Sequence, residues 1–206
     1  MQIAISIEPY LAVEKVKLTQ YIENIIQLSR EMARKGDQVV LHFDYFKPNP
    51  EIFELVQSYT DKIAVDLQLM QESVPSVAGF RSVSVDLIDQ PANLPTVKPE
   101  QAGIVLDLGC EWTKNADLVR AASYIIVMTV KCGKSGQLFQ PSAMDLVTQV
   151  RAINPKAVII IDGGVNENNI NLLKKAGVDV AVVGNYAKKC YENGSLAIGI
   201  NRLLHN

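Results

Sequence analysis

The sequence has few cysteines and no long hydrophobic run. Its three cysteines, Cys110, Cys132 and Cys190, are odd in number and follow no metal-binding or redox spacing, so we expect free thiols in a reducing compartment. Nowhere do about 18 apolar residues stand in a row, and the N-terminus has no charged segment followed by a long apolar stretch. We therefore expect neither a membrane span nor a secretory signal, and we predict a cytoplasmic protein.

An excess of basic residues is also missing. The chain carries 20 lysines and arginines against 22 aspartates and glutamates, a net charge of −2, so no basic face for nucleic acid is expected. Only two histidines occur, His42 and His205, which leaves few candidates for histidine chemistry. The 206 residues, 48% of them hydrophobic, suffice for one sizeable core, and we predict a single domain spanning residues 1–206.

Eight short apolar runs, most of them rich in valine and isoleucine, are predicted β-strands. They lack a strict alternation of apolar and polar residues, which is typical of parallel strands covered on both faces. The runs are 2–7, 38–43, 62–69, 80–87, 102–108, 123–130, 157–162 and 179–184. An open doubly wound sheet would normally have fewer strands in a chain this short. We therefore predict an α/β protein with a (β/α)8 TIM barrel, and the open sheet is the alternative.

Amphipathic patterns between these runs predict helices. Asn49 before Pro50 and Asn166 before Glu167 are expected N-caps, and Gly177 is expected to end a helix. The predicted helices are 14–34, 50–59, 113–121, 142–152, 167–176 and one near the C-terminus.

The regular alternation of strands and helices breaks in the middle of the chain. Residues 70–82 leave room for about two helical turns, and residues 89–100 contain three prolines, which oppose a regular helix. We expect the helices after the third and fourth strands to be shortened and the outer wall over strands 3 to 5 to be thin.

Polar side chains stand near the carboxyl ends of the predicted strands, where a barrel of this type places its reacting groups. His42 and Asp44 are two residues apart and therefore share one strand face. With a second aspartate on another strand, such as Asp66, Asp107 or Asp162, they could hold a divalent cation or exchange protons with a substrate. A hydrogen-bonded core histidine is the alternative interpretation of His42. Further candidates in this region are Ser6, Glu8, Asp66, Gln68, Met70, Asp107 and Met128.

Glycine-rich loops follow the last three predicted strands, at 133–137, 162–164 and 182–189. Backbone N–H groups in such loops, with helix N-termini behind them, can bind a phosphate dianion. Barrels of this class frequently bind phosphate after strands 7 and 8. Each loop alone is equally consistent with an ordinary turn that needs glycine for a positive φ. Three in succession on one rim favour a phosphate-binding barrel.

Four segments, taken in order, resemble the ribulose-phosphate 3-epimerase family: LHFDYFKPN, VDLQLM, IIVMTVKCGKSGQLF and IDGGVNENNINLLKKAGVDVAVVGN. The resemblance extends over nearly the whole chain. It implies an epimerase that converts a phosphorylated keto-sugar, D-ribulose 5-phosphate, to D-xylulose 5-phosphate. In that family two aspartates serve opposite faces of the carbon beside the carbonyl, and Asp44 and Asp162 match them.

The resemblance also implies a divalent metal, such as Zn, Fe, Mn or Mg, that stabilises an enediolate. His42, Asp44 and Asp162 match three of the family's four ligands. Gln68 stands where the family has a second histidine, which weakens the site and favours harder ions such as Mn²⁺ or Mg²⁺. The residues that match the family's substrate and phosphate contacts are Ser6, Met70, Met128, Gly163, Gly164, Gly184 and Asn185, the last of which stands where the family has serine. In the loop after the sixth strand, Gly133, Ser135 and Gly136 are also predicted to bind the substrate.

Departures from the family pattern all fall on the expected active rim. Besides Gln68, the segment DYFKPN is several residues shorter than in the family, and VKCGKSGQ differs from the family's sixth loop. Three hypotheses follow: an epimerase with an altered metal site, a non-catalytic barrel that binds a phosphosugar or a partner protein, and a decarboxylase or aldolase relative. A decarboxylase or aldolase relative is expected to have a lysine near the end of the third strand, where this chain has Gln68. The retained aspartate pair favours the first, because facing carboxylates repel each other without a substrate or metal. A homo-oligomer is left open.

Overall fold

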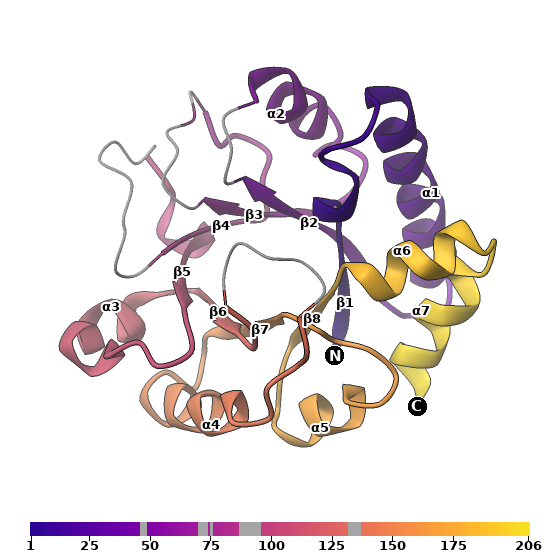
Figure 1. Ribbon diagram of the computed structural model, residues 1–206. Helices are drawn as coiled ribbons and strands as arrows, with labels where there is room; N and C mark the ends of the chain where they lie inside the picture. Colours follow the sequence, from indigo (N-terminus) through magenta and orange to yellow (C-terminus); the bar gives the residue numbers. More distant parts are fainter. Residues whose placement is uncertain (46–48, 70–73, 75, 87–95, 132–136) are drawn as a thin grey trace.

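Eight parallel strands close into a barrel in the computed structural model, which describes residues 1–45, 49–69, 74, 76–86, 96–131 and 137–206. Each strand pairs with its neighbours in chain order, and β8 pairs with β1 (Figure 1). The strands are β1 (Gln2–Ser6), β2 (Val39–Tyr45), β3 (Val65–Leu69), β4 (Ser82–Asp86), β5 (Ala102–Leu106), β6 (Tyr124–Met128), β7 (Val158–Asp162) and β8 (Val180–Val183). The predicted TIM barrel is confirmed.

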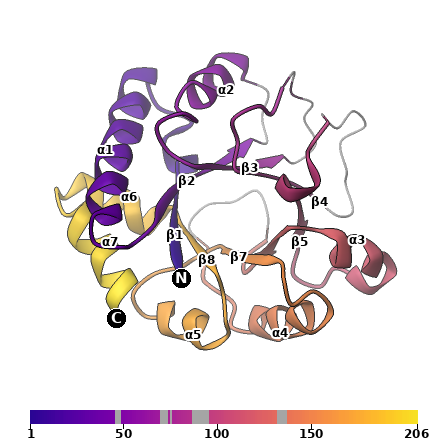
Figure 2. The ribbon, with the colours of Figure 1, turned by 180° about the vertical axis from the view of Figure 1, so that it is seen from behind.

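Helices surround the ring of strands, as both face views show (Figure 1 and Figure 2). The α-helices are α1 (Lys15–Ala33), α2 (Pro50–Gln57), α3 (Ala116–Ala121), α4 (Ala143–Ile153), α5 (Ile170–Lys175), α6 (Asn185–Glu192) and α7 (Leu196–His205). The short 3₁₀ helices are η1 (Glu8–Tyr10), η2 (Pro99–Gln101) and η3 (Trp112–Asn115). None of the helices in the described parts of the chain is long and apolar enough to cross a membrane.

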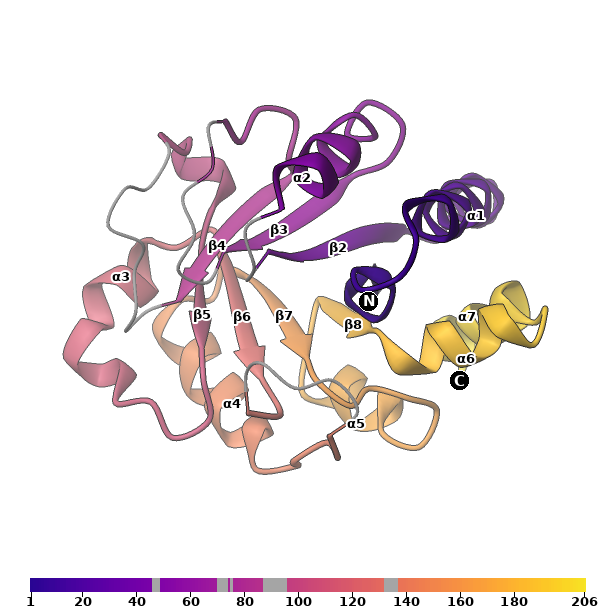
Figure 3. The same ribbon diagram turned by 45° about the horizontal axis from the view of Figure 1, so that its top comes forward.

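The long helix α1 shows how the sequence pattern produces this ring. Its buried side chains include Leu18, Ile22 and Ile25, three to four residues apart, which form one apolar stripe that packs beside β2. Fully burying each such side chain contributes about 1.5–3 kcal/mol. Helices α6 and α7 lie next to α1, on the side of the barrel where both termini are found (Figure 3).

One of the two predicted N-caps is right and the other is wrong. The Asn49 side chain accepts a hydrogen bond from the Ile52 backbone N–H at 3.2 Å, and α2 begins at Pro50 as predicted. Asn166 does not cap α5, which begins three residues later than expected, at Ile170. The Asn166 side chain instead bonds the Asn168 backbone N–H and the Gly164 carbonyl, so it stabilises a turn before the helix.

The outer wall between β3 and β5 carries little regular structure in the parts that the structure describes. Residues 74 and 76–81 contain no helix, and the single turn η2 precedes β5. This agrees with the expected shortening of the helices after the third and fourth strands. Residues 70–73, 75 and 87–95 lie outside the described chain.

The barrel interior is divided into an apolar and a polar part. Apolar side chains from β5 to β8, with Ala4 and Val40, fill one part. The inner faces of β2, β3 and β4 instead carry buried polar side chains: His42, Asp44, Asp66, Gln68, Ser82, Ser84 and Asp86. Because a buried polar group is costly unless it is paired, this polar part is where a functional site is expected.

Candidate active site

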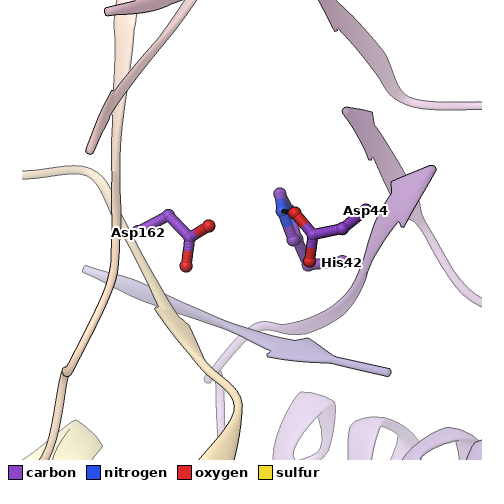
Figure 4. Close-up of side chains that lie close together, drawn as sticks. All are labelled: His42, Asp44 and Asp162. Carbon is purple, nitrogen blue, oxygen red and sulfur yellow. Dashed lines mark hydrogen bonds and ion pairs between the residues drawn. The ribbon is translucent and has the colours of Figure 1, made fainter. Parts of the chain in front are cut away.

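Three ionisable side chains meet inside the barrel near the carboxyl ends of the strands. His42 and Asp44 come from β2, and Asp162 is the last residue of β7. One ligand atom of each lies within 4.8 Å of the others. In Figure 4 the Asp162 carboxylate points across the barrel toward the His42 ring and the Asp44 carboxylate. His42 has no exposed surface, and Asp44 is buried. Asp162 is partly exposed at the mouth of the barrel, the end where the carboxyl ends of the strands lie.

Two hydrogen bonds hold the Asp44 carboxylate. The Ser6 hydroxyl donates to Oδ2 at 3.1 Å, and the His42 ring nitrogen Nε2 lies 3.2 Å from Oδ1. Ser6 in turn accepts a hydrogen bond from the Glu8 backbone N–H at 3.1 Å. Both oxygens of Asp44 are therefore fixed by neighbours on β1 and β2, and the Ser6 hydroxyl acts on this carboxylate.

The environment separates the pKa values of the two aspartates. Burial and the charge of Asp44 together raise the pKa of Asp162 to about 7, against the opposing effect of His42. Burial also acts to raise the pKa of Asp44, but the charge and hydrogen bond of His42 and the bond from Ser6 outweigh it and lower that pKa. Burial disfavours the protonated ring of His42, yet the facing carboxylates raise its pKa to about 9. The site thus holds one ionised and one readily protonated carboxyl, the pattern of an acid–base pair.

The same three side chains fit a divalent cation. Imidazole nitrogen and carboxylate oxygens are common ligands of Zn²⁺, Mn²⁺ and Fe²⁺. The Nδ1 atom of His42 is buried and makes no hydrogen bond to any residue that the structure describes. A bound cation would be coordinated by the His42 ring and the two carboxylates, and its positive charge would offset the repulsion between Asp44 and Asp162.

A glycine turn follows Asp162 and packs against the loop after β6. Gly163 and Gly164 have φ of 120° and 60°, a region that favours glycine. The Thr129 backbone N–H donates to the Asp162 carbonyl at 2.7 Å, and its hydroxyl donates to the carbonyls of Asp162 and Gly163. A Cβ on Gly164 would lie 2.6 Å from the Phe139 backbone nitrogen, so the two loops can meet only at a glycine.

A family model described as the ribulose-phosphate 3 epimerase family matches residues 31–187. The chain belongs to the ribulose-phosphate 3-epimerase family. The ribulose-phosphate 3-epimerase of Aquifex aeolicus is 31% identical over 172 residues, which are 73% of this chain and 78% of that protein. One from Helicobacter pylori is 34% identical over 189 residues, 81% and 87% of the two chains. That of Escherichia coli K12 is 26% identical over 199 residues, 81% and 88%.

Solved structures outside this epimerase family share the fold. A mutant tryptophan synthase alpha-subunit from Pyrococcus furiosus has a TM-score of 0.65 at 13% identity and covers 100% of this chain and 98% of its own. A thiamine phosphate pyrophosphorylase from the same organism has a TM-score of 0.59 at 16% identity, with coverage of 98% and 93%. At such identities the likeness shows the barrel fold alone.

Three residues expected from the resemblance to bind the substrate, Met128, Gly184 and Asn185, lie on β6 and at the start of α6. Met128 is buried on the inner face of β6 and pairs in register with Asp162. Gly184 is the N-cap residue of α6 and lies close to the Ser6 side chain, and Asn185 is the first residue of that helix. Met70, Gly133, Ser135 and Gly136 lie outside the described residues.

Two of the broader candidates, Glu8 and Asp66, border the group of His42, Asp44 and Asp162 without belonging to it. Glu8 follows β1 and belongs to η1. Asp66 is fully buried but bonds to Arg81 and to Ser82, the first residue of β4, so it lies toward the amino ends of the strands. Thr129 was missed in the sequence, because a threonine after a strand gives no signal that its hydroxyl ties two loops together.

Gly164→Ala is expected to lower the free energy of unfolding by more than about 2 kcal/mol. A side chain at φ of 60° costs about 1–2 kcal/mol, and the new Cβ would also clash with the Phe139 backbone. Urea unfolding of the purified variant measures the loss. The matched control is Gly194→Ala, where φ is 65° but nothing lies within 4 Å of the added carbon. Equal losses in the two variants would contradict the close approach of the loops.

Proposed function

We propose that this chain is an epimerase of a phosphorylated keto-sugar and converts D-ribulose 5-phosphate to D-xylulose 5-phosphate. Family membership and the curated relatives named ribulose-phosphate 3-epimerase support a carbohydrate epimerase. The observation that carries the reaction is the meeting of Asp44 and Asp162 from β2 and β7, with carboxylate oxygens within 4.8 Å inside the barrel. Inverting one carbon requires proton transfer at both of its faces, and two opposed carboxyl groups are suited to it.

In the proposed mechanism Asp44 and Asp162 act on opposite faces of the carbon beside the carbonyl. Asp44, held by Ser6 and His42, takes the proton from one face and leaves an enediolate. The Asp162 carboxyl delivers its proton to the other face, and proton exchange with water restores both groups. When bound by His42, Asp44 and Asp162, a divalent cation supplies the charge that stabilises the enediolate oxygens.

The phosphate of the substrate is proposed to bind at the turns after β7 and β8. The glycine turn at 163 and 164 directly follows Asp162, and the backbone at Gly184 starts α6 close to Ser6. Backbone N–H groups at a helix start favour a dianion. A phosphate at these turns would place a keto-sugar between Asp44 and Asp162.

The direct test is incorporation of solvent deuterium. In D₂O the purified protein is expected to exchange deuterium into C3 of ribulose 5-phosphate, with added Mn²⁺ or Zn²⁺ increasing the rate. Mass spectrometry of the sugar phosphate measures the exchange, and the same protein in excess chelator is the control. If no keto-pentose or keto-hexose phosphate exchanges under any metal, the chain is a non-catalytic phosphosugar-binding or partner-binding barrel instead.

A further inference from the structure

Gln68 adjoins the group of His42, Asp44 and Asp162 on the next strand. It pairs in register with Asp44, and its neighbours Leu67 and Leu69 pack in the outer core between strands and helices. Successive side chains of a strand point to opposite faces, so Gln68 shares the inner face of the barrel with Asp44. It is 2% exposed.

The donor atoms around this position are nearly all oxygens. His42 supplies one imidazole, whereas Asp44 and Asp162 supply carboxylates. On the other side of Gln68 the register partner is Ser84, a fully buried hydroxyl whose oxygen makes no hydrogen bond to a residue that the structure describes. The inner face of β4 thus adds oxygen and no nitrogen next to Gln68.

A second imidazole is not available to this site. The sequence contains two histidines, and His205, the other one, lies at the end of α7 with its Nε2 atom 3.0 Å from Asp37 on an exposed surface. Asp37 lies just before β2, at the amino end of the strands, opposite the mouth. Any cation held by His42, Asp44 and Asp162 therefore has one histidine ligand.

We propose that Gln68 is an oxygen ligand of this cation and that it shifts the site from Zn²⁺ toward Mn²⁺ or Mg²⁺. Zn²⁺ prefers nitrogen and sulfur, whereas carboxylate and amide oxygens suit Mn²⁺ and Mg²⁺. One nitrogen from His42 and one oxygen each from Asp44, Asp162 and Gln68 form a ligand set that suits Mn²⁺ and Mg²⁺ better than Zn²⁺. This inference rests on the proposed function for the presence of a cation, but the binding preference is measured without any substrate.

The test compares metal binding by the wild-type protein, Gln68→His and Gln68→Leu. Calorimetric titration of each metal-free protein gives dissociation constants for Mn²⁺ and Zn²⁺. Gln68→His is expected to tighten Zn²⁺ binding at least about tenfold more than Mn²⁺ binding, because it adds a second imidazole. Gln68→Leu keeps the volume but removes the oxygen, and is expected to weaken Mn²⁺ binding about tenfold or more. Gln149→His on the exposed face of α4 is the matched control and leaves both constants unchanged.

A measurement on the wild-type protein alone guards against variants that fold poorly. Pulsed electron paramagnetic resonance of the wild-type Mn²⁺ form is expected to detect one coordinated imidazole nitrogen. Unchanged Mn²⁺ affinity in Gln68→Leu, an unchanged ratio of Zn²⁺ to Mn²⁺ affinity in Gln68→His, or no Mn²⁺ binding by the wild type would each overturn the proposal. If Gln68→Leu and Gln68→His change the metal affinities as expected but the protein exchanges no deuterium into the substrate, the proposed epimerase function is wrong. The assignment of Gln68 as a metal ligand would still hold.

Discussion

Asp162→Asn is expected to reduce deuterium incorporation into the substrate at least about a thousandfold. An amide at this position can neither deliver nor accept the proton, and a positioned acid or base contributes about 10²–10⁴-fold to a rate. The variant also removes one of three groups whose ligand atoms lie within 4.8 Å, so cation binding weakens as well. The measurement is the rate of exchange at saturating substrate, with the metal concentration raised until the rate is constant.

The fold is expected to survive this change. Asp162 is partly exposed at the end of β7, and its neutral replacement relieves the repulsion from Asp44. The unfolding temperature should therefore stay the same or rise slightly. Asp145→Asn, on the exposed first turn of α4, is the matched control and should keep full activity. An Asp162→Asn protein that retains more than a tenth of the exchange rate would rule out Asp162 as a proton carrier.

The order and number of strands could be predicted from the sequence because each strand is buried on both faces and reads as an apolar run. The predicted boundaries were less exact. The third run was predicted from residue 62, but β3 begins at Val65, since the backbone N–H groups of Lys62 and Ile63 bond the Tyr59 carbonyl in a turn. Ile63 is buried there without being in a strand. Apolar residues in a buried turn and in a strand give the same pattern.

Part of the candidate site could also be predicted from the sequence. Spacing by two residues placed His42 and Asp44 on one face, and the register confirms that they share it. That Asp162 faces them across the barrel followed from a family resemblance, because no local pattern encodes how a barrel closes. The bond from Ser6 to Asp44 joins residues 38 positions apart in the chain. Such partners depend on strand register, and sequence spacing does not reveal them.

Arg81→Met is expected to lower the free energy of unfolding by about 3–5 kcal/mol, the usual cost of leaving one member of a buried ion pair without its partner. Asp66 is fully buried, and the Arg81 guanidinium donates to both of its oxygens, with Nε at 2.7 Å from Oδ1. Ser82 donates a further bond at 2.7 Å. Methionine keeps the length of the side chain but leaves a buried carboxylate with one neutral donor. Chemical denaturation at constant pH measures the loss.

A second substitution separates the loss of charge pairing from the loss of packing. Adding Asp66→Asn to Arg81→Met removes the uncompensated charge, so the double variant should recover at least about 2 kcal/mol relative to Arg81→Met alone. Arg120→Met is the control, because its pair with Asp117 is exposed and such pairs contribute about 0–1 kcal/mol. No recovery in the double variant would mean that the arginine stabilises the barrel through its contacts with Gln2 and the Tyr124 ring instead.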